Sequence, residues 1–465
     1  MEDVRVIDLS DRVSGAYCTK LFADTGADVV KVEPPTGDPL RQWSVSGMVG
    51  RDGDPDGALF RYLAASKRSV VADLTTKPGR ERVLRLVAGA TFVVETMLPH
   101  RIEELGLGVD ALWAVNPAVT LVSISPFGRG GPRSDEDCPD FLLQALCGCI
   151  DAHGLPGRIP VCVGGRLGEW AGGAFAAAAA LTAAISARRT GRGEHIDVSL
   201  LECMALTQVS YPSVRASLPG GDRRRVVGPM IPSVEPCKDG FVGLSAIIAQ
   251  QWMDFARMIE RPDLADDPSL TSHTERDLRR EELQSAINAW TISRTAEDIV
   301  ETAALFRVPA APVGNGVTLP RMAQLVARDV IVENPRGGFP QPRPPFRMRT
   351  PPRPFAPAPT IGEHDGDPDL NAAGPAVTQA TAERTDSAAG LPLAGVKVLD
   401  FTAAWAGPIT TEFLASMGAD VIKVESIQRP DAMRFLVAAP AGPDWYEQGY
   451  IFNAANLGKR AITLN

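Results

Sequence analysis

The chain has 465 residues, which is enough for about three domains of ordinary size or two large α/β units. Hydrophobic residues make up 45% of it and charged residues 22%. This composition is typical of globular proteins and excludes a disordered, collagen-like or coiled-coil chain. The 47 lysines and arginines against 56 acidic residues give a net charge of −9. Such an acidic protein is not expected to bind nucleic acid or an anionic membrane in general.

Cysteine and histidine usage bears on compartment and metal binding. Seven cysteines are spread along the chain without a CxxC pair, and five histidines show neither HxxxH nor HExxH spacing. An odd, scattered set of cysteines favours a reducing, cytoplasmic compartment over a disulfide framework. The histidine spacing gives no support for a zinc site, so no metal is predicted. The N-terminus runs directly into the strand-like VRVIDL, which is not the pattern of a signal peptide.

The first part of the chain alternates between strand and helix patterns. Val4–Leu9 and Asp28–Val32 are predicted strands around a helix that opens at Ser14-Gly15, a βαβ unit of about 30 residues. Further elements follow: strand Ser69–Leu74, helix Pro78–Ala88, strand Thr91–Glu95, helix Val109–Val115 and strand Val119–Ile124. This alternation predicts an α/β fold with an open, Rossmann-like parallel sheet. No GxGxxG follows the first strand, which argues against an NAD or flavin site.

A long alanine-rich helix follows Gly168-Glu169 and ends near Gly191–Gly193. Its uncharged run, Ala171–Ala187, is shorter than the ~20 strongly apolar residues of a membrane span, so a buried helix is expected. From about residue 208 the pattern changes to a hairpin turn at Asp239-Gly240 and several amphipathic helices,. These helices are predicted at Gln250–Arg261, Thr274–Trp290 and Thr295–Phe306. We interpret this region as a separate, smaller α+β domain.

The end of the chain repeats its beginning. Residues 4–33 and 396–425 are identical at thirteen of thirty positions, at a constant offset of 392. The same offset pairs Phe60, Lys67 and Arg68 with a matching set, Phe452, Lys459 and Arg460, so that the whole overlap matches without a gap. We infer a tandem duplication of a large unit. Because the second copy stops at the equivalent of residue 73, the chain is expected to be a fragment of a longer tandem protein.

The domain organisation follows from these patterns. Residues 1–207 are predicted as the large domain, 208–321 as the small domain, 322–365 as a return segment to the large domain, 366–394 as a linker and 395–465 as a partial second copy. Ten prolines between Pro335 and Pro359 exclude a regular helix there. The stretch 366–392 that follows has no aromatic residue, as is typical of a flexible linker.

Several segments, in one order, resemble the class III coenzyme A transferases, the family of formyl-CoA and carnitine-CoA transferases. They are VRVIDLS…GADVVKVE, KRSVVADLTTKPGR, FVVET at Glu95, VNPAVTLVSISPFGRGGP, GRGEHIDVSLLE, VPAAPV and IGEH at 361–364. The resemblance covers residues 1 to about 365, and again 395 to 465. It implies a Rossmann-like large domain, an inserted small domain and an interlocked dimer. A full second copy in the same polypeptide can supply the partner of that dimer.

The resemblance also implies the reaction. Coenzyme A moves from an acyl-CoA donor to a carboxylic acid through a carboxylate that forms an anhydride and then a thioester. The substrate is acyl-CoA, without metal, NAD or flavin. The family's nucleophile is an aspartate, and the matching residue here is Glu169. Glutamate carries the carboxylate one methylene further, and a misplacement of ~1 Å can cost about a hundredfold in rate. Its place at a helix N-terminus favours the ionised form and supplies N–H groups for an oxyanion.

Coenzyme A contacts are carried over from the family position by position. Val13 and Ser14 form the turn after the first strand, where a helix N-terminus suits phosphate or ribose. Asp140 matches an acidic family position near the active site. The other candidates are Ala72, Asp73, Leu74 and Thr75, then Thr96, Met97 and Leu98, and finally Arg101 and Arg133 in place of a lost basic contact.

Two alternatives stay open beside a working transferase. The glutamate at the nucleophile position, and a proline-rich stretch at 227–236 where some relatives have a mobile glycine-rich loop, leave room for a weak or inactive scaffold. Such a copy would bind coenzyme A and support an active second copy. The α-methylacyl-CoA racemases share this fold but need a histidine immediately before Asp140. Pro139 stands there and cannot abstract a proton.

Overall fold

The computed structural model describes residues 1–45, 53–151, 153–154, 158–209, 230–349, 354–371, 390–435 and 442–464. The chain divides into two compact units. The first comprises Met1–Ile150, Cys162–Arg225 and Val332–Asn465, and the second comprises Asp151–Val161 and Val226–Ile331. The second unit thus includes residues 151–161, which the sequence analysis left in the large domain. Most of the predicted linker (372–389) and residues 227–229 of the proline-rich stretch lie outside the described residues.

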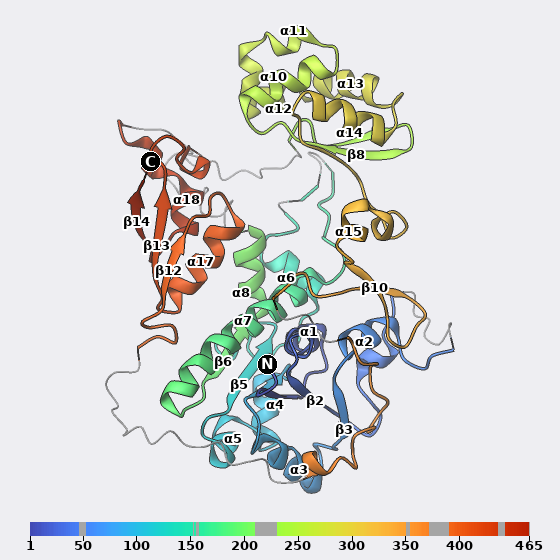
Figure 1. The fold of residues 1–465 in the computed structure, drawn as a ribbon, viewed down its shortest axis with the longest axis vertical. Helices are drawn as coiled ribbons and strands as arrows, with labels where there is room; N and C mark the ends of the chain where they lie inside the picture. The colour runs from blue at the N-terminus through green and yellow to red at the C-terminus, as the bar shows by residue number, and fades with distance from the viewer. Residues whose placement is uncertain are drawn as a thin grey trace. The chain divides into compact units, whose positions relative to one another are not determined.

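A six-stranded parallel sheet forms the centre of the first unit (Figure 1). Its strands are β1 Arg5–Asp8, β2 Asp28–Glu33, β3 Arg68–Val71, β4 Phe92–Glu95, β5 Thr120–Ser125 and β6 His195–Ser199, in the order β3-β2-β1-β4-β5-β6. The predicted α/β fold with an open, Rossmann-like parallel sheet is confirmed. The strand order reverses between β1 and β4, and ligands of such sheets bind beside this point, at the carboxyl ends of the strands.

Helices cover both faces of this sheet. They are α1 Val13–Asp24, α2 Ala58–Leu63, α3 Lys77–Val87, α4 Pro99–Glu104, α5 Val109–Val115, α6 Asp140–Leu146, α7 Leu167–Thr190 and α8 Leu200–Met204. Successive strand residues point to opposite faces. Val6 and Phe92 therefore join the core beneath α1 and α7, whereas Ile7 and Val93 join the core beneath α3 and α5. Burial on both faces explains why these strands read as continuous apolar runs.

Helix α7 packs closely on α1 because small residues line their contact. A Cβ atom added at Gly173 would lie 2.5 Å from the carbonyl oxygen of Ser14, and Ala176, Ala177 and Ala180 of α7 are buried. The helix ends at Gly191, whose φ of 69° permits its N–H to reach the Ala187 carbonyl,. By length and composition α7 also passes as a membrane span. The core helix of a globular protein passes the same test.

The second unit is a smaller α+β structure, as predicted. Its antiparallel sheet consists of β7 Val234–Cys237, β8 Gly240–Leu244 and β9 Ala310–Pro312. Its helices are α10 Ala249–Met258, α11 Pro262–Ala265, α12 His273–Leu278, α13 Arg280–Thr291, α14 Ala296–Leu305 and α15 Ala323–Ala327. The single helix predicted over 274–290 is wrong. It divides at Arg279, which has φ −102° and ψ 25° and pairs with Asp267 before the break and Glu282 after it.

The return segment and the C-terminal segment complete the chain. The return segment carries β10 Ile331–Glu333 and β11 Pro340–Pro342. The start of the predicted linker forms α16 Pro368–Asn371, whose Leu370 is buried in the core of the first unit. The C-terminal segment carries β12 Lys397–Asp400, α17 Ala406–Ser416, β13 Asp420–Glu425, α18 Tyr450–Ala455 and β14 Arg460–Thr463. Its three strands are parallel, in the order β12-β13-β14. The register of β12 on β13 equals that of β1 on β2 after a shift of 392 residues.

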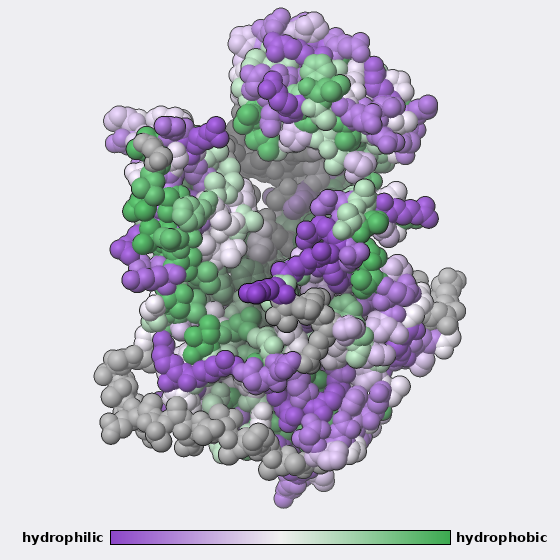
Figure 2. Space-filling view, in the orientation of Figure 1, coloured by the Kyte–Doolittle hydropathy of each residue, from purple (hydrophilic) through white to green (hydrophobic). Residues whose placement is uncertain are grey.

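The C-terminal segment leaves apolar side chains uncovered, visible as green atoms at the left of Figure 2. Leu399 is 62% exposed and Phe401 71%. Their equivalents at the offset of 392, Ile7 and Leu9, are buried in the core of the complete sheet. The described part of the segment therefore exposes apolar side chains whose equivalents the complete unit buries.

The close contact of α1 and α7 yields a stability prediction. Gly173→Val should lower the free energy of unfolding by about 1–3 kcal/mol, because its side chain meets the Ser14 backbone rather than a yielding side chain,. Ala174→Val is the matched control, since Ala174 is exposed on the same helix and loses only helix propensity, well under 1 kcal/mol. Urea unfolding followed by circular dichroism measures both. Equal midpoints for the two variants would contradict close packing at Gly173.

Candidate active site

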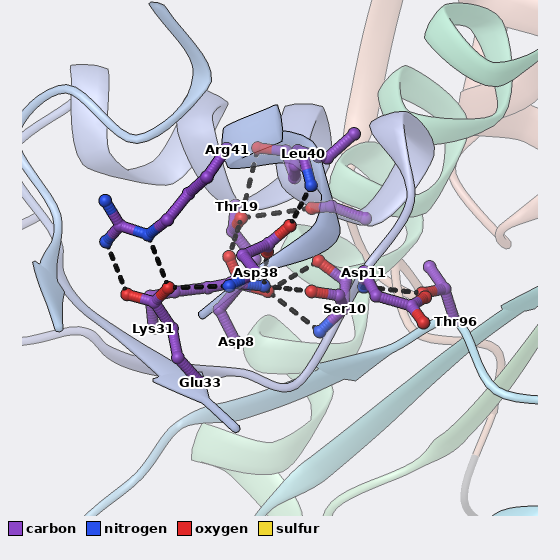
Figure 3. Close-up of polar contacts among 12 residues, drawn as sticks. Asp8, Ser10, Asp11, Thr19, Lys31, Glu33, Asp38, Leu40, Arg41 and Thr96 are labelled. Atoms are coloured by element: carbon purple, nitrogen blue, oxygen red, sulfur yellow. Dashed lines mark hydrogen bonds and ion pairs between the residues drawn. The ribbon is translucent and has the colours of Figure 1, made fainter. Parts of the chain in front are cut away.

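A buried ionic network fixes the turn between β1 and α1. Asp8, at the end of β1, accepts hydrogen bonds from Ser10 N and Oγ on one carboxylate oxygen. Its other oxygen accepts bonds from Thr19 Oγ1 at 2.7 Å and Lys67 Nζ at 3.0 Å. Burial opposes the ionisation of Asp8, but Lys31 and Lys67, with the two hydroxyls, hold its pKa well below the usual range. Figure 3 shows Asp8, Ser10, Thr19 and Lys31 gathered at this point.

A second network holds the next turn of the chain. Arg41, in the 3₁₀ turn Pro39–Gln42, binds both oxygens of Glu33 at 2.7 Å and Asp56 Oδ2 at 2.7 Å. Such a bidentate pair is strong and directional. The pair ties the turn to the end of β2, also drawn in Figure 3. Trp43, which follows the turn directly, is thereby held in place.

The first network recurs in the C-terminal segment. Asp400 accepts bonds from Thr402, Thr411 and Lys459, which correspond to Ser10, Thr19 and Lys67 at the offset of 392. The gap-free match inferred from the sequence is wrong at one place. The partners of Lys423 and Glu425 are Asp431 and Arg434, which correspond to Asp38 and Arg41 at an offset of 393. A one-residue insertion before Asp431 is compensated before Phe452.

The N-terminal ends of α1, α6 and α7 meet at Glu169, which is 4% exposed. Glu169 Oε2 lies 3.3 Å from the backbone nitrogen of Ser14, the second residue of α1. The Glu169 backbone N–H donates to Asp140 Oδ1, at the start of α6, over 3.2 Å. A Cβ at Gly168 would lie 2.7 Å from the same Asp140 oxygen, so this approach needs a glycine. Three of the predicted site residues, Ser14, Asp140 and Glu169, therefore form one cluster.

The cluster has the groups that carboxylate chemistry needs. The helix macrodipoles of α1 and α7 favour negative charge at their N-terminal ends. The Ser14 N–H already binds one Glu169 oxygen and can stabilise charge that develops there. Ser14 Oγ is buried and has no hydrogen-bond partner within the described residues. Asp140 is held by Gln144 Nε2 at 2.7 Å and orients the first turn of α7.

Arg166 belongs to this cluster and was missed by the sequence analysis. Its Nη1 lies 2.9 Å from Glu169 Oε1, and its guanidinium lies 5.1 Å from the centre of the Trp43 ring. Trp170, next to Glu169 in α7, donates to the Gly165 carbonyl and packs edge-on against Tyr17 of α1. The sequence could have indicated this ion pair only through the spacing of three residues between Arg166 and Glu169. Many ion pairs on the surfaces of helices have the same spacing.

The remaining predicted coenzyme A contacts lie at the carboxyl ends of β1, β3 and β4. Val13 begins α1, and Thr96 binds Asp11 through both their side chains and the Asp11 backbone N–H. The residues after β3 form a turn in which the Asp73 carboxylate accepts bonds from Thr75, with Ala72 buried and Leu74 partly buried beside it. After β4, Met97 donates its N–H to Glu95, and Leu98 occupies the N-cap position of α4 without a side-chain cap. These assignments stay predictions.

The ion pairs of Arg101 and Arg133 are with other residues than Ser14, Asp140 and Glu169. Arg101 is half exposed and pairs with Glu104, three residues away on the same helix. Arg133 pairs with Glu136 at 2.8 Å and lies over the Phe127 ring. Each thus has a local acidic partner, and a role in binding coenzyme A stays a prediction. Among the described residues, no group of three or more His, Cys, Asp or Glu side chains is arranged to hold a metal ion.

Glu95 ends β4 beside the point where the strand order reverses, and it is fully buried. Its Oε2 accepts the Met97 N–H at 2.6 Å, whereas Oε1 has no hydrogen-bond partner in the described structure. Burial raises the pKa of Glu95 to about 7. The folded state therefore retains a proton on Glu95 at pH values where an unfolded chain has lost it.

This pKa predicts a pH-dependent stability. Between pH 4.5 and about 7 the unfolded chain releases the Glu95 proton first, so the stability of the wild type should fall as pH rises through this window,. A glutamine at position 95 cannot titrate. The free energy of unfolding of Glu95→Gln relative to that of the wild type should therefore increase by about 3 kcal/mol between pH 4 and pH 8. Urea unfolding across this range tests it, with the exposed Glu81→Gln as control. Parallel curves for wild type and Glu95→Gln would contradict a protonated Glu95.

Comparison with known proteins identifies the family. The model of CoA-transferase family III matches residues 1–365 and 393–465. The succinyl-CoA–D-citramalate CoA-transferase of Chloroflexus aurantiacus is 32% identical over 71% of this chain and 83% of its own length. The succinate–glutarate CoA-transferase of Agrobacterium fabrum is 30% identical over 78% and 93%.

Solved structures agree with these relatives. A CAIB/BAIF family protein from Brucella suis superposes with a TM-score of 0.69 at 28% identity, over 78% of this chain and 96% of its own. Rv3272 from Mycobacterium tuberculosis superposes with a TM-score of 0.68 at 26% identity, over 78% and 97%. The match of the family model over most of the sequence, the two relatives and the shared fold lead to one conclusion. The chain belongs to CoA-transferase family III.

Proposed function

We propose that this chain transfers coenzyme A from an acyl-CoA donor to a carboxylic acid acceptor, with Glu169 as the nucleophile. The observation that carries the proposal is the place of the Glu169 carboxylate. It is buried where three helix N-termini meet, with one oxygen on the Ser14 N–H and the other on Arg166. Relatives of 30–32% identity that are named as CoA-transferases support the reaction class.

The reaction runs through two kinds of intermediate on Glu169. Oxygen Oε1 attacks the thioester carbonyl of the donor and expels the coenzyme A thiolate, leaving an acyl-glutamyl anhydride. The thiolate then attacks the glutamyl carbonyl and releases the donor acid, leaving a glutamyl-CoA thioester. The acceptor carboxylate attacks this thioester to form a new anhydride, and the thiolate returns to the acceptor carbonyl. Product acyl-CoA leaves and Glu169 is regenerated.

The surrounding groups suit these steps. Ser14 N–H, on Oε2, stabilises the negative charge that collects on this oxygen when the glutamyl carbonyl is attacked. The Ser14 hydroxyl is buried and has no hydrogen-bond partner among the described residues, so it is available as a further donor. Asp140, which holds the Glu169 backbone, is a positioning residue. An aspartate at position 169 would carry its carboxylate one methylene less far than Glu169, whose carboxylate reaches both the Ser14 N–H and Arg166.

The nucleophile assignment is testable by trapping. The full chain, incubated with acyl-CoA and quenched with hydroxylamine, should give a hydroxamate on Glu169 that mass spectrometry locates. Glu169→Gln should abolish the adduct, because an amide is a poor nucleophile at neutral pH. Glu169→Asp should retain adduct formation, with a rate that differs by up to about a hundredfold because the carboxylate is displaced by ~1 Å.

Other outcomes change the assignment. An adduct that survives Glu169→Gln would place the nucleophile at another residue. No adduct in the parent or in Glu169→Asp would favour the scaffold function, in which this copy binds coenzyme A without reacting.

We infer as well that residues 395–465 arose by duplication, and that a second large domain pairs with the first. The equal strand registers and the repeated Asp400 network support the duplication.

Exposed apolar side chains on α6 and α7 support the pairing; they are Phe141, Leu142, Leu146, Leu181 and Ile185. Sedimentation velocity should report a dimer of the full chain. A monomer at micromolar concentration would contradict the pairing.

A further inference from the structure

Arg166 occupies a backbone position at which arginine is energetically unfavourable. It is the N-cap of α7, with φ 56° and ψ 43°, and makes no side-chain cap. A left-handed backbone at a residue other than glycine costs on the order of 1–3 kcal/mol. Ser, Thr, Asp and Asn are the favoured caps, and a cation opposes the positive end of the helix dipole. Strain of this kind at a buried carboxylate points to a role in binding rather than in folding.

The side chain of Arg166 joins the buried nucleophile to solvent. Its guanidinium pairs with Glu169 at 2.9 Å, yet the Arg166 side chain is 41% exposed whereas that of Glu169 is 5% exposed. A guanidinium has five N–H donors. One of them binds Glu169, and within the described residues no other hydrogen bond is made. Four donors therefore remain for a ligand that approaches from the open side.

The surroundings of Arg166 fit an organic acid. The centre of the Trp43 ring lies 5.1 Å from the Arg166 guanidinium, within the range of a cation–π contact. Trp43 also lines an apolar hollow of about 330 Å³, together with Leu59, Tyr62 and Pro340. The hydroxyl of Ser14, whose backbone N–H binds Glu169 Oε2, is buried and has no hydrogen-bond partner within the described residues. The Glu169 carboxylate thus has a partly exposed cation against it, and the Trp43 ring that contacts this cation also borders an apolar hollow.

We propose that Arg166 binds the free carboxylate of a dicarboxylic acyl group and so makes this site selective for dicarboxylic acids and their CoA thioesters. This inference rests on the proposed function, since it assumes that the acyl group is presented to Glu169. A carboxylate matches the planar fork of arginine in a bidentate pair. Arg166 exchanges its pairing with Glu169 Oε1 for the ligand, and no proton or covalent bond changes in that exchange. Oε1 is then free to attack the thioester.

The test compares two thioesters with acyl chains of four carbons. Succinyl-CoA has the distal carboxylate and butyryl-CoA lacks it. In the full chain, Arg166→Gln should lower kcat/KM for succinyl-CoA at least about tenfold, the worth of a charge-assisted hydrogen bond. Because Arg166 also contacts Glu169, the decisive quantity is the ratio of the succinyl-CoA value to the butyryl-CoA value, which should fall at least about tenfold. Arg166→Lys should keep part of the preference, since it keeps the charge without the fork.

A matched control separates this effect from a general loss of charge. Arg188→Gln removes the same charge from an exposed position near the other end of α7, about 30 Å away along the helix. It should leave the ratio of the two kcat/KM values unchanged. An equal ratio in wild type and Arg166→Gln would overturn the proposal.

A binding measurement keeps the two proposals apart. In a Glu169→Gln background, where no adduct forms, calorimetry should show succinyl-CoA binding at least about tenfold tighter than butyryl-CoA. Adding Arg166→Gln should erase that difference. If Arg166→Gln erases the binding preference but the wild type transfers no coenzyme A, the proposed function is wrong and the role of Arg166 in binding stands. Equal binding of both thioesters before Arg166 is changed would overturn the role of Arg166 even if Glu169 reacts.

Discussion

The hydrogen bond from the Ser14 backbone to the Glu169 carboxylate joins residues 155 positions apart, and the candidate site depends on it. It forms because α1 and α7 approach closely at Gly173. Their approach in turn needs the start of α1 to be fixed, which the buried Asp8 achieves through Thr19 in α1 and Lys67 before β3. The buried ion pair at the end of β1 thus helps to position the Glu169 carboxylate. Removing one partner of such a buried pair typically costs about 3–5 kcal/mol.

Much of the fold and the main site residue follow from local patterns. Alternating strands and helices predict the parallel sheet, and the resemblance to a family singles out Glu169 before its helix. Arg166 escapes this reasoning because its importance comes from a left-handed backbone and a side-chain contact, neither of which sequence periodicity reveals. Arg101 and Arg133 are predicted as replacements for a lost basic contact to coenzyme A. Each pairs with an acidic residue three positions away, and their role in binding stays a prediction.

The C-terminal segment shows how one physical constraint is met twice. Asp400 accepts hydrogen bonds from a threonine and a lysine, as Asp8 does. Arg434 forms an ion pair with Glu425, as Arg41 does with Glu33. The one-residue shift before Asp431 leaves these contacts intact, so the ion pairs, and not the exact loop length, are what both segments share. Leu399 and Phe401 are exposed because none of the described helices of the segment covers them, whereas helices bury their equivalents in the complete sheet,.

If Glu169 is the nucleophile, one carboxylate oxygen of the acceptor acid becomes part of the Glu169 carboxylate in each turnover. The most direct test supplies an acceptor acid labelled with oxygen-18 in its carboxylate, together with an acyl-CoA donor. The anhydride route leaves one acceptor oxygen on the enzyme in each turnover. The peptide that contains Glu169 should therefore gain mass by exchange of oxygen-16 for oxygen-18, and the released donor acid should become labelled in later turnovers. Formation of product acyl-CoA with an unlabelled Glu169 peptide would contradict the account.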